Sequence, residues 1–481
     1  MTRRPLVRWL PTRLPMRLPP ASPLLAPLLA ALLLAGCAAH VAPRPASTLE
    51  PMAHWRSHVG PASAAAPIER DWWSAFGDPA LSALVTTALA HNDNLLLARS
   101  RVEEYRARVT IAGANTLPTL SVGVAPERTR TLDAFNRPYV TNLIQGQFQA
   151  SYEADVWGRL GQLSAAAVAS YQARQTSVDA AALSVAASVA TGYLMLRGLD
   201  AQLVLAQATL VLRQQSLALA QRQFAVGYSS RLEMLQAQSE YNSTAETIAP
   251  LQRSISEQEN ALSLLAGVNP GAIARGRALA ELMVPTVPAG LPSDLLQRRP
   301  DIAEAQQNVL ALDASLAAAR DQMLPSFKLT AAAGGEATNL ATFLNAPTAL
   351  WSFGGSIMAP LFEGGRIQAQ TDLAAAQRNQ ALITYDSVVR NAFAETDNSL
   401  TAVFRLNQQA VQNDASRNSA AATLRIAHER YRNGYASYLD EIDAQRTLYS
   451  ADVAQLQLKT RILVAAVNLY RAIGGGWQAP H

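Results

Sequence analysis

The chain contains the stretch Phe224-Ala225-Val226-Gly227-Tyr228 and repeats its pattern, 207 residues later, as Tyr431-Arg432-Asn433-Gly434-Tyr435. Three further pairs share this offset: Leu117-Pro118 with Leu324-Pro325, Gly158-Arg159 with Gly365-Arg366, and Ala237-Gln238 with Ala444-Gln445. Short matches are common in an alanine-rich chain, but one constant offset over this length is not expected by chance. Self-similarity at a fixed period indicates a duplicated architecture. We therefore predict a tandem duplication.

The duplication defines the domains that we predict. They are a leader at 1–36, a linker and equatorial segment at 37–78, repeat 1 at 79–267, an inter-repeat linker at 268–292, repeat 2 at 293–474 and a tail at 475–481. Each repeat opens with a helix-forming segment, at 79–115 and at 293–323. Both segments run into Leu-Pro, where proline ends the helix. A β-hairpin is predicted next, at about 119–156 and about 326–362.

A very long helix-forming segment follows each hairpin, at 158–224 and at 364–431. Strand and helix join at Gly158 in repeat 1 and at Gly364-Gly365 in repeat 2. The long segments lack proline and are rich in Ala, Leu, Gln and Arg, a composition typical of helices packed as coiled coils. About 67 residues span roughly 100 Å as a helix. Turns at Gly227 and Gly434 lead into returning segments of about forty residues.

The predicted strands alternate strictly between apolar and polar residues. One face carries Ile144, Gly146, Phe148, Ala150, Tyr152 and Ala154 in repeat 1, and Trp351, Phe353, Gly355, Ile357, Ala359 and Leu361 in repeat 2. The opposite face of the first run is rich in glutamine. This pattern is typical of a barrel strand with lipid outside and water inside, although a soluble half-buried hairpin alternates in the same way.

Four strands cannot close a barrel, and an open edge in lipid leaves backbone groups unpaired. Closure therefore requires eight strands from two chains or twelve from three. An eight-stranded barrel is filled by its own side chains, whereas twelve strands leave a lumen. After the leader we find no apolar run of membrane-helix length, so the strands are expected to make the crossing.

The N-terminus has the features of a bacterial secretion signal. Five arginines precede the apolar run 24–35, and small residues then lead to Cys37. The start lies at Met1 or at Met16, which begins a leader of more ordinary length. Cys37 is the only cysteine, and its surroundings resemble a lipobox, in which the cysteine is acylated, for example with palmitate. The resemblance implies an outer-membrane lipoprotein.

Charge and composition exclude several other functions. The chain has 40 basic and 36 acidic residues, and the leader contains five of the arginines, so the mature chain is close to neutral. No nucleic-acid footprint is expected from it. One cysteine excludes an intrachain disulfide and a catalytic thiol, and no histidines have ligand spacing. His428, Glu429 and Arg430 are interpreted as a solvated helix face. We predict no enzymatic activity, no metal and no cofactor beyond the lipid on Cys37.

Several motifs resemble the outer-membrane factors of tripartite efflux systems, the TolC-like family, and in particular its NodT-like lipoprotein branch. They are Asp71-Trp72-Trp73, Arg298-Arg299-Pro300-Asp301-Ile302, Glu153-Ala154-Asp155-Val156-Trp157-Gly158-Arg159 and the tip motif that runs from Asn433 to Arg446. The resemblance covers nearly all of the mature chain. It implies an α+β membrane protein that is a homotrimer. Its long helical hairpins form a periplasmic α-barrel continuous with a 12-stranded transmembrane β-barrel, four strands per chain.

The resemblance also implies a function and partners. The chain would be an outer-membrane channel that passively conducts drugs or other small molecules to the exterior. It would receive them from a periplasmic adaptor protein and an inner-membrane pump, often of the RND class. The alternative is a structural, trimeric coiled-coil lipoprotein without a pore, with its strands as a soluble cap. An envelope enzyme is disfavoured because no catalytic constellation is present.

The glycine turns farthest from the strands are the physical candidates for a periplasmic gate. Asp440 and Asp443 lie three residues apart and therefore on one helical face, whereas the first turn offers Glu233 and Gln236. In the family, carboxylates at the two aspartate positions line the entrance, and the tyrosine matching Tyr431 takes part in closing it. The alternative is that both aspartates only favour the positive end of a helix.

The chain departs from the family pattern at one gate position. Some relatives have a basic residue where this chain has Ala436, and that residue bridges to the acid that matches Glu233. Arg231 or Arg432 could substitute for it.

Overall fold

A computed structural model describes residues 49, 55–56, 68–286 and 292–478. All of these residues belong to one compact unit, 43–481. The predicted leader at 1–36, both candidate start codons and Cys37 lie outside the described residues, as does most of the segment 37–78. The signal and the lipid site therefore stay predictions.

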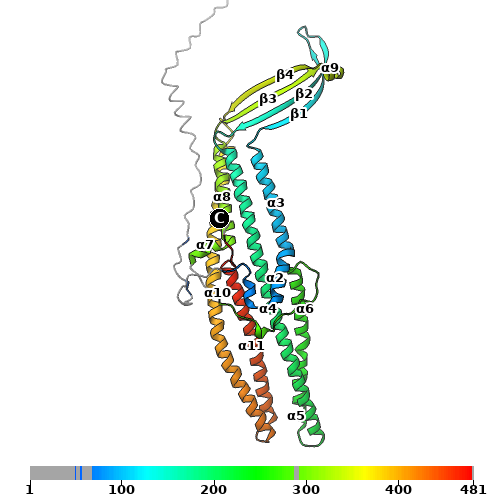
Figure 1. Cartoon of the computed structure of the whole chain (residues 1–481), viewed down its shortest axis with the longest axis vertical. Helices are drawn as coiled ribbons and strands as arrows, with labels where there is room; N and C mark the ends of the chain where they lie inside the picture. The colour runs from blue at the N-terminus through cyan, green and yellow to red at the C-terminus, as the bar shows by residue number, and fades with distance from the viewer. Residues whose placement is uncertain (1–48, 50–54, 57–67, 287–291, 479–481) are drawn as a thin grey trace, which may run out of the picture. The chain divides into compact units, whose positions relative to one another are not determined.

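Four antiparallel strands form one sheet in the order β1-β2-β3-β4 (Figure 1). Repeat 1 contributes β1 (Thr119–Leu132) and β2 (Pro138–Ala154), and repeat 2 contributes β3 (Ser326–Ala337) and β4 (Thr348–Met358). The two hairpins join through β2 and β3, where Ala154 pairs with Phe327. Within the protomer, β1 and β4 are therefore edge strands with one side unpaired.

The predicted alternation of the strands is observed in the sheet register. Val122, Phe148, Ala333 and Trp351 form one row across all four strands, so the apolar faces of both hairpins lie on the same side. Large side chains on this side are strongly exposed, with Trp351 at 82% and Leu120 at 74%. The prediction was wrong at its end, because β4 stops at Met358 and Pro360 lies beyond it, so Ala359 and Leu361 are not strand residues.

Two helices of 67 residues each continue from the sheet: α4 (Arg159–Ala225) and α10 (Arg366–Arg432). A left-handed glycine precedes each helix, Gly158 with φ 85° and Gly365 with φ 82°. L-residues rarely adopt this conformation, so glycine permits the sharp change from strand to helix. The Asp155 carboxylate also accepts hydrogen bonds from the backbone N–H groups of Leu160 and Gly161 at 2.9 and 2.7 Å.

The opening segments of both repeats are helical but interrupted, which corrects the single segments predicted at 79–115 and 293–323. Repeat 1 has α2 (Pro79–His91) and α3 (Asp93–Ala114), separated by an extended Asn92. Repeat 2 has the short α7 (Leu295–Arg298) and α8 (Pro300–Asp321). Here the proline ring forces the preceding Arg299 out of the helical region.

The returning helices differ between the repeats. Repeat 2 has one continuous helix, α11 (Tyr438–Ala472), whereas repeat 1 has α5 (Arg231–Glu246) and α6 (Ile248–Leu265). Pro250 explains the interruption at Thr247, because proline has no N–H to donate to the carbonyl four residues earlier. The two repeats therefore have the same order of elements, but the returning helix is interrupted in repeat 1 and continuous in repeat 2.

The main core lies near the middle of the helical region, beside the described part of the equatorial segment. A 3-10 helix, η1 (Trp72–Phe76), packs there, and Trp72 stacks on Tyr470 of α11 with ring centroids 5.1 Å apart. The middle of α4 is buried in the same core through Val189, Tyr193 and Leu196.

One expectation about membrane helices was wrong. Of the helices that the structure describes, α4 is long and apolar enough, by length and composition, to cross a membrane. Its alanine-rich middle meets that test although it belongs to the core, with Ala186 and Ala190 buried there. A core helix passes the same test as a spanning helix, so the strands remain the expected crossing.

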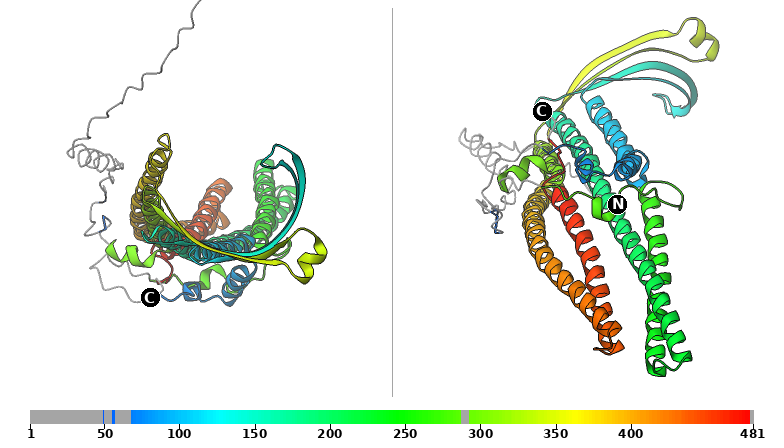
Figure 2. Two further views of the ribbon diagram at one scale, coloured as in Figure 1. Left: turned by 90° about the horizontal axis from the view of Figure 1, so that it is seen from above. Right: turned by 60° about the horizontal axis from the view of Figure 1, so that its bottom comes forward.

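The helices form two long hairpins side by side, α4 with α5 and α6, and α10 with α11 (Figure 1). The sheet lies at one end of this unit and both glycine turns lie at the other. Seen from above, the helices follow an arc (Figure 2).

Candidate functional site

The two turns at the far end from the sheet have the same backbone geometry. Gly227 and Gly434 are left-handed, with φ 76° and 77°. In each turn the glycine N–H and the following tyrosine N–H donate to carbonyls in the last turn of the long helix. Such bonds satisfy helix carbonyls that would otherwise lack partners. This backbone geometry explains why glycine recurs at both turns.

The first turn of each returning helix begins with a serine cap. Ser230 accepts from the Glu233 N–H at 3.3 Å, and Ser437 accepts from the Asp440 N–H at 3.3 Å. Asp440 additionally accepts from the Ser437 N–H at 2.9 Å, which completes a capping box. Hydrogen bonds from the Ser437 side chain and backbone lower the pKa of Asp440. Asp440 therefore serves the helix end and also presents a stable negative charge.

Asp443 lies one helical turn beyond Asp440, and both side chains are exposed. Glu233 is half-buried in the other tip. Burial first, and then the negative charge of Glu233, raise the pKa of the Tyr431 phenol. The Tyr431 phenol of repeat 2 therefore experiences the charge of Glu233 in repeat 1, whereas the two aspartates face solvent within the protomer.

A small apolar cluster joins the two tips. Its buried members are Leu217 and Ala220 of α4, Ala237 of α5, and Tyr438 and Ile442 of α11. Tyr431 of α10 packs on Tyr438 with ring centroids 5.3 Å apart. Burial raises the pKa of Tyr438 to about 12, with the Glu441 charge as the next cause. Opening one tip away from the other would therefore break this cluster.

A buried ionic network next to the cluster was missed by the sequence reading. Glu240 of α5 accepts from Arg446 of α11, with Nε at 2.8 Å, and also pairs with Arg213 of α4 at 3.4 Å. Arg213 donates in turn to Gln445 of α11. Arg213 and Glu240 are 6% and 7% exposed, so their pair within the first hairpin is shielded from water. The Arg446 side chain, which reaches Glu240 from the other hairpin, is exposed. Burial lowers the pKa of Arg213, and the Glu240 charge opposes that shift.

The same network extends to α10 through Glu441. Its carboxylate lies 2.8 Å from His428 Nδ1 and accepts from Gln445 at 3.0 Å. His428 is exposed, as the interpretation of a solvated helix face expects, and from that face it contacts the buried Glu441. The sequence signal for this network was the presence of charged residues within segments predicted to pack as coiled coils. Comparison of the two repeats does not reveal it, because position 447, the equivalent of Glu240, is threonine.

The two arginines proposed as substitutes at the Ala436 position make no ion pair with Glu233 within the described protomer. Arg231 and Arg432 are both exposed at the tips. The ionic link between the hairpins lies instead at Glu240, about two helical turns from Glu233.

The strand-to-helix joints line a cavity of about 630 Å³. Gly158 and the pair Gly364-Gly365 provide the left-handed turns at these joints. Glu153 pairs with Arg159 at 2.6 Å, and Trp157 Nε1 donates to the Pro325 carbonyl at 2.8 Å. The first contact joins β2 to α4, and the second joins this strand-to-helix joint to the start of β3.

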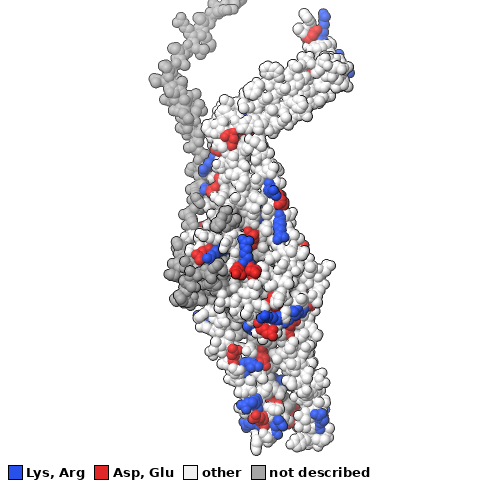
Figure 3. Space-filling model, in the orientation of Figure 1, with Lys and Arg blue, Asp and Glu red and all other residues white. Residues whose placement is uncertain are grey.

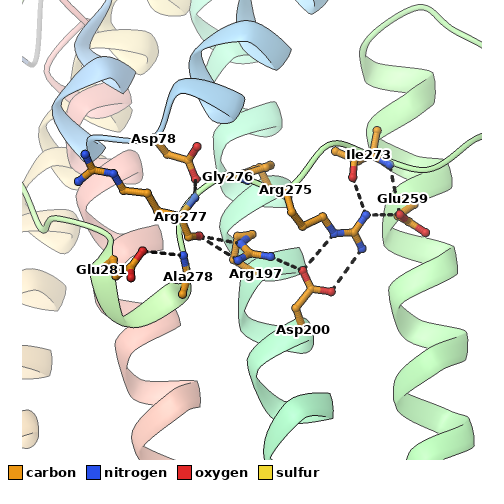
Figure 4. Close-up of polar contacts among 11 residues, drawn as sticks. Asp78, Arg197, Asp200, Glu259, Ile273, Arg275, Gly276, Arg277, Ala278 and Glu281 are labelled. Carbon is orange, nitrogen blue, oxygen red and sulfur yellow. Dashed lines mark hydrogen bonds and ion pairs between the residues drawn. The ribbon is translucent and has the colours of Figure 1, made fainter.

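The described part of the inter-repeat linker is fixed to repeat 1 by charge (Figure 4). Arg275 donates to Asp200 of α4 at 3.2 Å and pairs with Glu259 of α6. The Arg277 N–H donates to Asp78 at 3.1 Å, and Asp78 also accepts from the Tyr193 hydroxyl at 2.8 Å. This fixes the middle of the first helical hairpin, while its tip is held by the network at Glu240.

Charge is distributed unevenly on the visible surface (Figure 3). The sheet is almost free of charged side chains, while charges gather at its far end and along the helices. The charged residues at the end of the sheet farthest from the helices belong to the part of the β1–β2 hairpin that extends past β3 and β4. They are Glu127, Arg128, Arg130, Asp133 and Arg137.

The model of the outer membrane efflux protein family matches the chain twice, at residues 84–268 and 291–475. The chain belongs to this family of outer-membrane efflux channels. It is 34% identical over 407 residues to the solvent efflux pump outer membrane protein SrpC of Pseudomonas putida, covering 84% of this chain and 86% of that protein. It is 33% identical over 412 residues to the cation efflux system protein CusC of Escherichia coli, covering 85% and 88%.

Solved structures agree with this assignment. A crystal structure of CusC covers 91% of this chain and 99% of its own, with 30% identity and a TM-score of 0.80. The open state of the Neisseria gonorrhoeae MtrE outer membrane channel covers 90% and 97%, with 29% identity and a TM-score of 0.79. The predicted function as an outer-membrane efflux channel is confirmed, and the alternative of a structural lipoprotein without a pore is not supported.

Proposed function

We propose that three copies of this chain form one continuous duct across the outer membrane and into the periplasm. The observation that carries the proposal is the sheet, which exposes a broad apolar face and leaves β1 and β4 unpaired at its edges. Unpaired strand edges are costly in lipid, so β4 of one copy pairs with β1 of the next. Three copies give twelve strands and a lumen.

The length of the paired strands fits a membrane. Eleven residues of β2, from Ile144 to Ala154, pair with β3. At about 3.3 Å per residue and a tilt of about 45°, they rise roughly 25 Å, the height of the apolar band of outer-membrane barrels. Charged residues bound this stretch, Glu127 and Arg128 at one end and Glu153 with Lys328 at the other. The helices α4 and α10 then extend the duct by roughly 100 Å into the periplasm.

Acylation of Cys37 anchors the N-terminus in the outer membrane. The support is the apolar run 24–35 and the small residues directly before the chain's only cysteine. Replacement of Cys37 by Ser is expected to abolish incorporation of a palmitate analogue. Retained labelling of Cys37→Ser would refute this anchor.

The duct is passive and works with a periplasmic adaptor and an inner-membrane pump, which we propose to be of the RND class. The support is the resemblance to tripartite systems and the breadth of the relatives' names, which range from solvent to pyoverdine to cation efflux. One architecture with such different cargo indicates that selection lies in the partners. We propose no enzymatic activity for the chain.

The periplasmic gate lies at the two tips. Asp440 and Asp443 line it, repeated three times by the symmetry of the trimer, and Tyr431 with Glu233 holds the tips together. The capped, exposed carboxylate of Asp440 and the position of Tyr431 between the repeats support these roles.

Reconstitution in planar lipid bilayers tests the proposal. The purified full-length protein is expected to migrate as a trimer and to give discrete single-channel currents. A stable trimer that gives no currents, or a protein that remains monomeric or dimeric in lipid, would contradict it.

A further inference from the structure

The connection between β3 and β4 contains a short helix, α9 (Leu340–Asn345), which lies beside the end of the sheet (Figure 1). The Asn339 side chain caps it by accepting from the Thr342 N–H at 2.9 Å. Although α9 connects β3 and β4, it also contacts β2. Its Phe343 ring reaches across to β2, where a Cβ atom added to Gly146 would lie 2.5 Å from the ring.

This contact identifies the face of the sheet on which α9 rests. Gly146 shares a row with Val124 and Gly335, two residues along each strand from the row of Phe148 and Trp351. Residues two apart point to the same side, so Phe343 covers the apolar face. Pro347 lies on the same side, because a Cβ on Gly335 would be 2.8 Å from it. The glycines leave a hollow that the aromatic ring fills, as in aromatic rescue of strand glycines.

The outer side of α9 has no covering within the described chain. Leu340 is 60% exposed and Leu344 is 71% exposed, while Phe343 is half-buried against the sheet. These leucines extend the exposed apolar surface formed by Phe148 and Trp351. In the proposed barrel this surface is in contact with lipid.

The level of α9 is set by the register of the strands. Gly146 lies one row from the last row of the four-stranded sheet. β3 ends one residue beyond that row at Ala337, and only β1 and β2 continue, with Glu127, Arg128 and Arg130. The helix therefore lies where the apolar band ends and the charged hairpin begins. Helices with apolar residues on one side bind membranes at this boundary.

We propose that α9 is an interfacial anchor, which inserts Leu340 and Leu344 into the lipid of the outer membrane at the outer rim of the barrel. It lies on the lipid side and does not cover the mouth of the duct. The helix leans toward β2, away from the β4 edge that would meet a neighbouring copy, so lipid is its partner. This inference rests on the proposed placement of the sheet in the membrane.

Site-directed spin labelling tests the anchor in the full-length protein reconstituted in vesicles. A nitroxide at Leu344→Cys is compared with one at Phe353→Cys, on the apolar face, and one at Phe135→Cys, at the tip of the charged hairpin. The wild-type chain, treated with the same label, gives the background from Cys37. We expect the ratio of oxygen to nickel-chelate accessibility at position 344 to be several-fold higher than at 135.

The controls separate this inference from the proposed function. A label at 344 that is as accessible to nickel as the one at 135, while 353 remains in lipid, would overturn the anchor alone. If the label at 353 is also aqueous, the placement of the sheet fails and the anchor fails with it.

A glycine substitution gives a second test. Gly146→Ala places a methyl group where the Phe343 ring lies, so the ring and α9 are expected to move and the label at 344 to gain mobility. Gly355→Ala is the matched control, because its Cβ would meet Leu329 on the same face at an ordinary 3.4 Å. Equal spectra for the two variants would contradict the contact between Phe343 and Gly146.

Discussion

The tips of the two helical hairpins share a backbone but differ in how they are held. Both have a left-handed glycine and a serine cap, 207 residues apart. The second tip continues into the unbroken α11, whereas the first is followed by an interruption at Thr247. Arg446 of α11 reaches across to Glu240 of α5. The second hairpin, with its continuous α11, thus holds the interrupted first hairpin through this ion pair. The two tips have the same backbone conformation but different roles.

The largest expected effect comes from removing the acid that joins the tips. Glu240→Leu leaves the buried Arg213 guanidinium without its carboxylate partner, and breaking a buried ion pair in this way costs about 3 to 5 kcal/mol. We expect the first tip to separate from the second, with a larger single-channel conductance in planar bilayers. The exposed Glu246→Leu on the same helix is the control. Unchanged conductance and unchanged hydrogen exchange at the tips would show that the network does not hold them.

The two aspartates of the second tip are expected to affect block of the channel by cations more than the stability of the fold. The double variant Asp440→Ala with Asp443→Ala should weaken block by divalent cations, because it removes the exposed carboxylates that we place at the gate. Asp443→Asn alone should reduce block without loosening the helix end, since only Asp440 belongs to the capping box. Currents and block identical to wild type would remove both residues from the gate.

A smaller effect is expected at alkaline pH. Burial raises the pKa of Tyr438 from 10.0 to about 12. Because the folded pKa is raised, the contribution of this phenol is fully present below about pH 10 and is lost as the pH rises through about 12. Tyr193 is raised to about 12 as well. Tyrosinate absorbance should therefore reveal late-titrating phenols, and Tyr438→Phe should remove one of them. A late titration unchanged in Tyr438→Phe would contradict this assignment.

The smallest expected effect concerns the interruption itself. Pro250→Ala restores an N–H and permits α5 and α6 to join, with a change in stability of less than about 1 kcal/mol. Slower amide exchange around Thr247 would show that proline alone causes the difference between the hairpins. Unchanged exchange there would assign the interruption to packing.

Local chemistry made much of the fold predictable. The absence of proline from two long runs predicted α4 and α10, and the alternation beginning at Ile144 predicted a two-faced sheet. Breaks were harder to predict. Pro300 was visible as a helix boundary. Asn92 caps α3 locally by accepting from the Leu95 N–H, but its side chain also donates to the Leu265 carbonyl at 2.8 Å, a contact 173 residues distant that spacing does not reveal.

The candidate site divides in the same way. The glycine turns and the carboxylate pair at Asp440 and Asp443 follow from sequence spacing and the family resemblance. The partnership of Glu240 with Arg213 and Arg446 does not, because the three residues come from three helices and have no repeat equivalents. His428 was expected on a solvated face and is exposed, but its contact with Glu441 of α11 was not predictable from spacing.

The duplication, the long helices, the two-faced strands and the need for more than one copy were predictable from the amino-acid sequence, because they follow from periodicity, proline and glycine chemistry, and strand count. Tertiary structure decided the order of the strands, the placement of α9 on the apolar face and the pairing of charges between hairpins. Such contacts depend on how elements distant in the chain pack together, and the periodicity of the sequence does not show which of these elements are neighbours. Burial of Arg213, Glu240 and Glu441 makes it costly to remove their partners, since a charge removed from water is unfavourable without one.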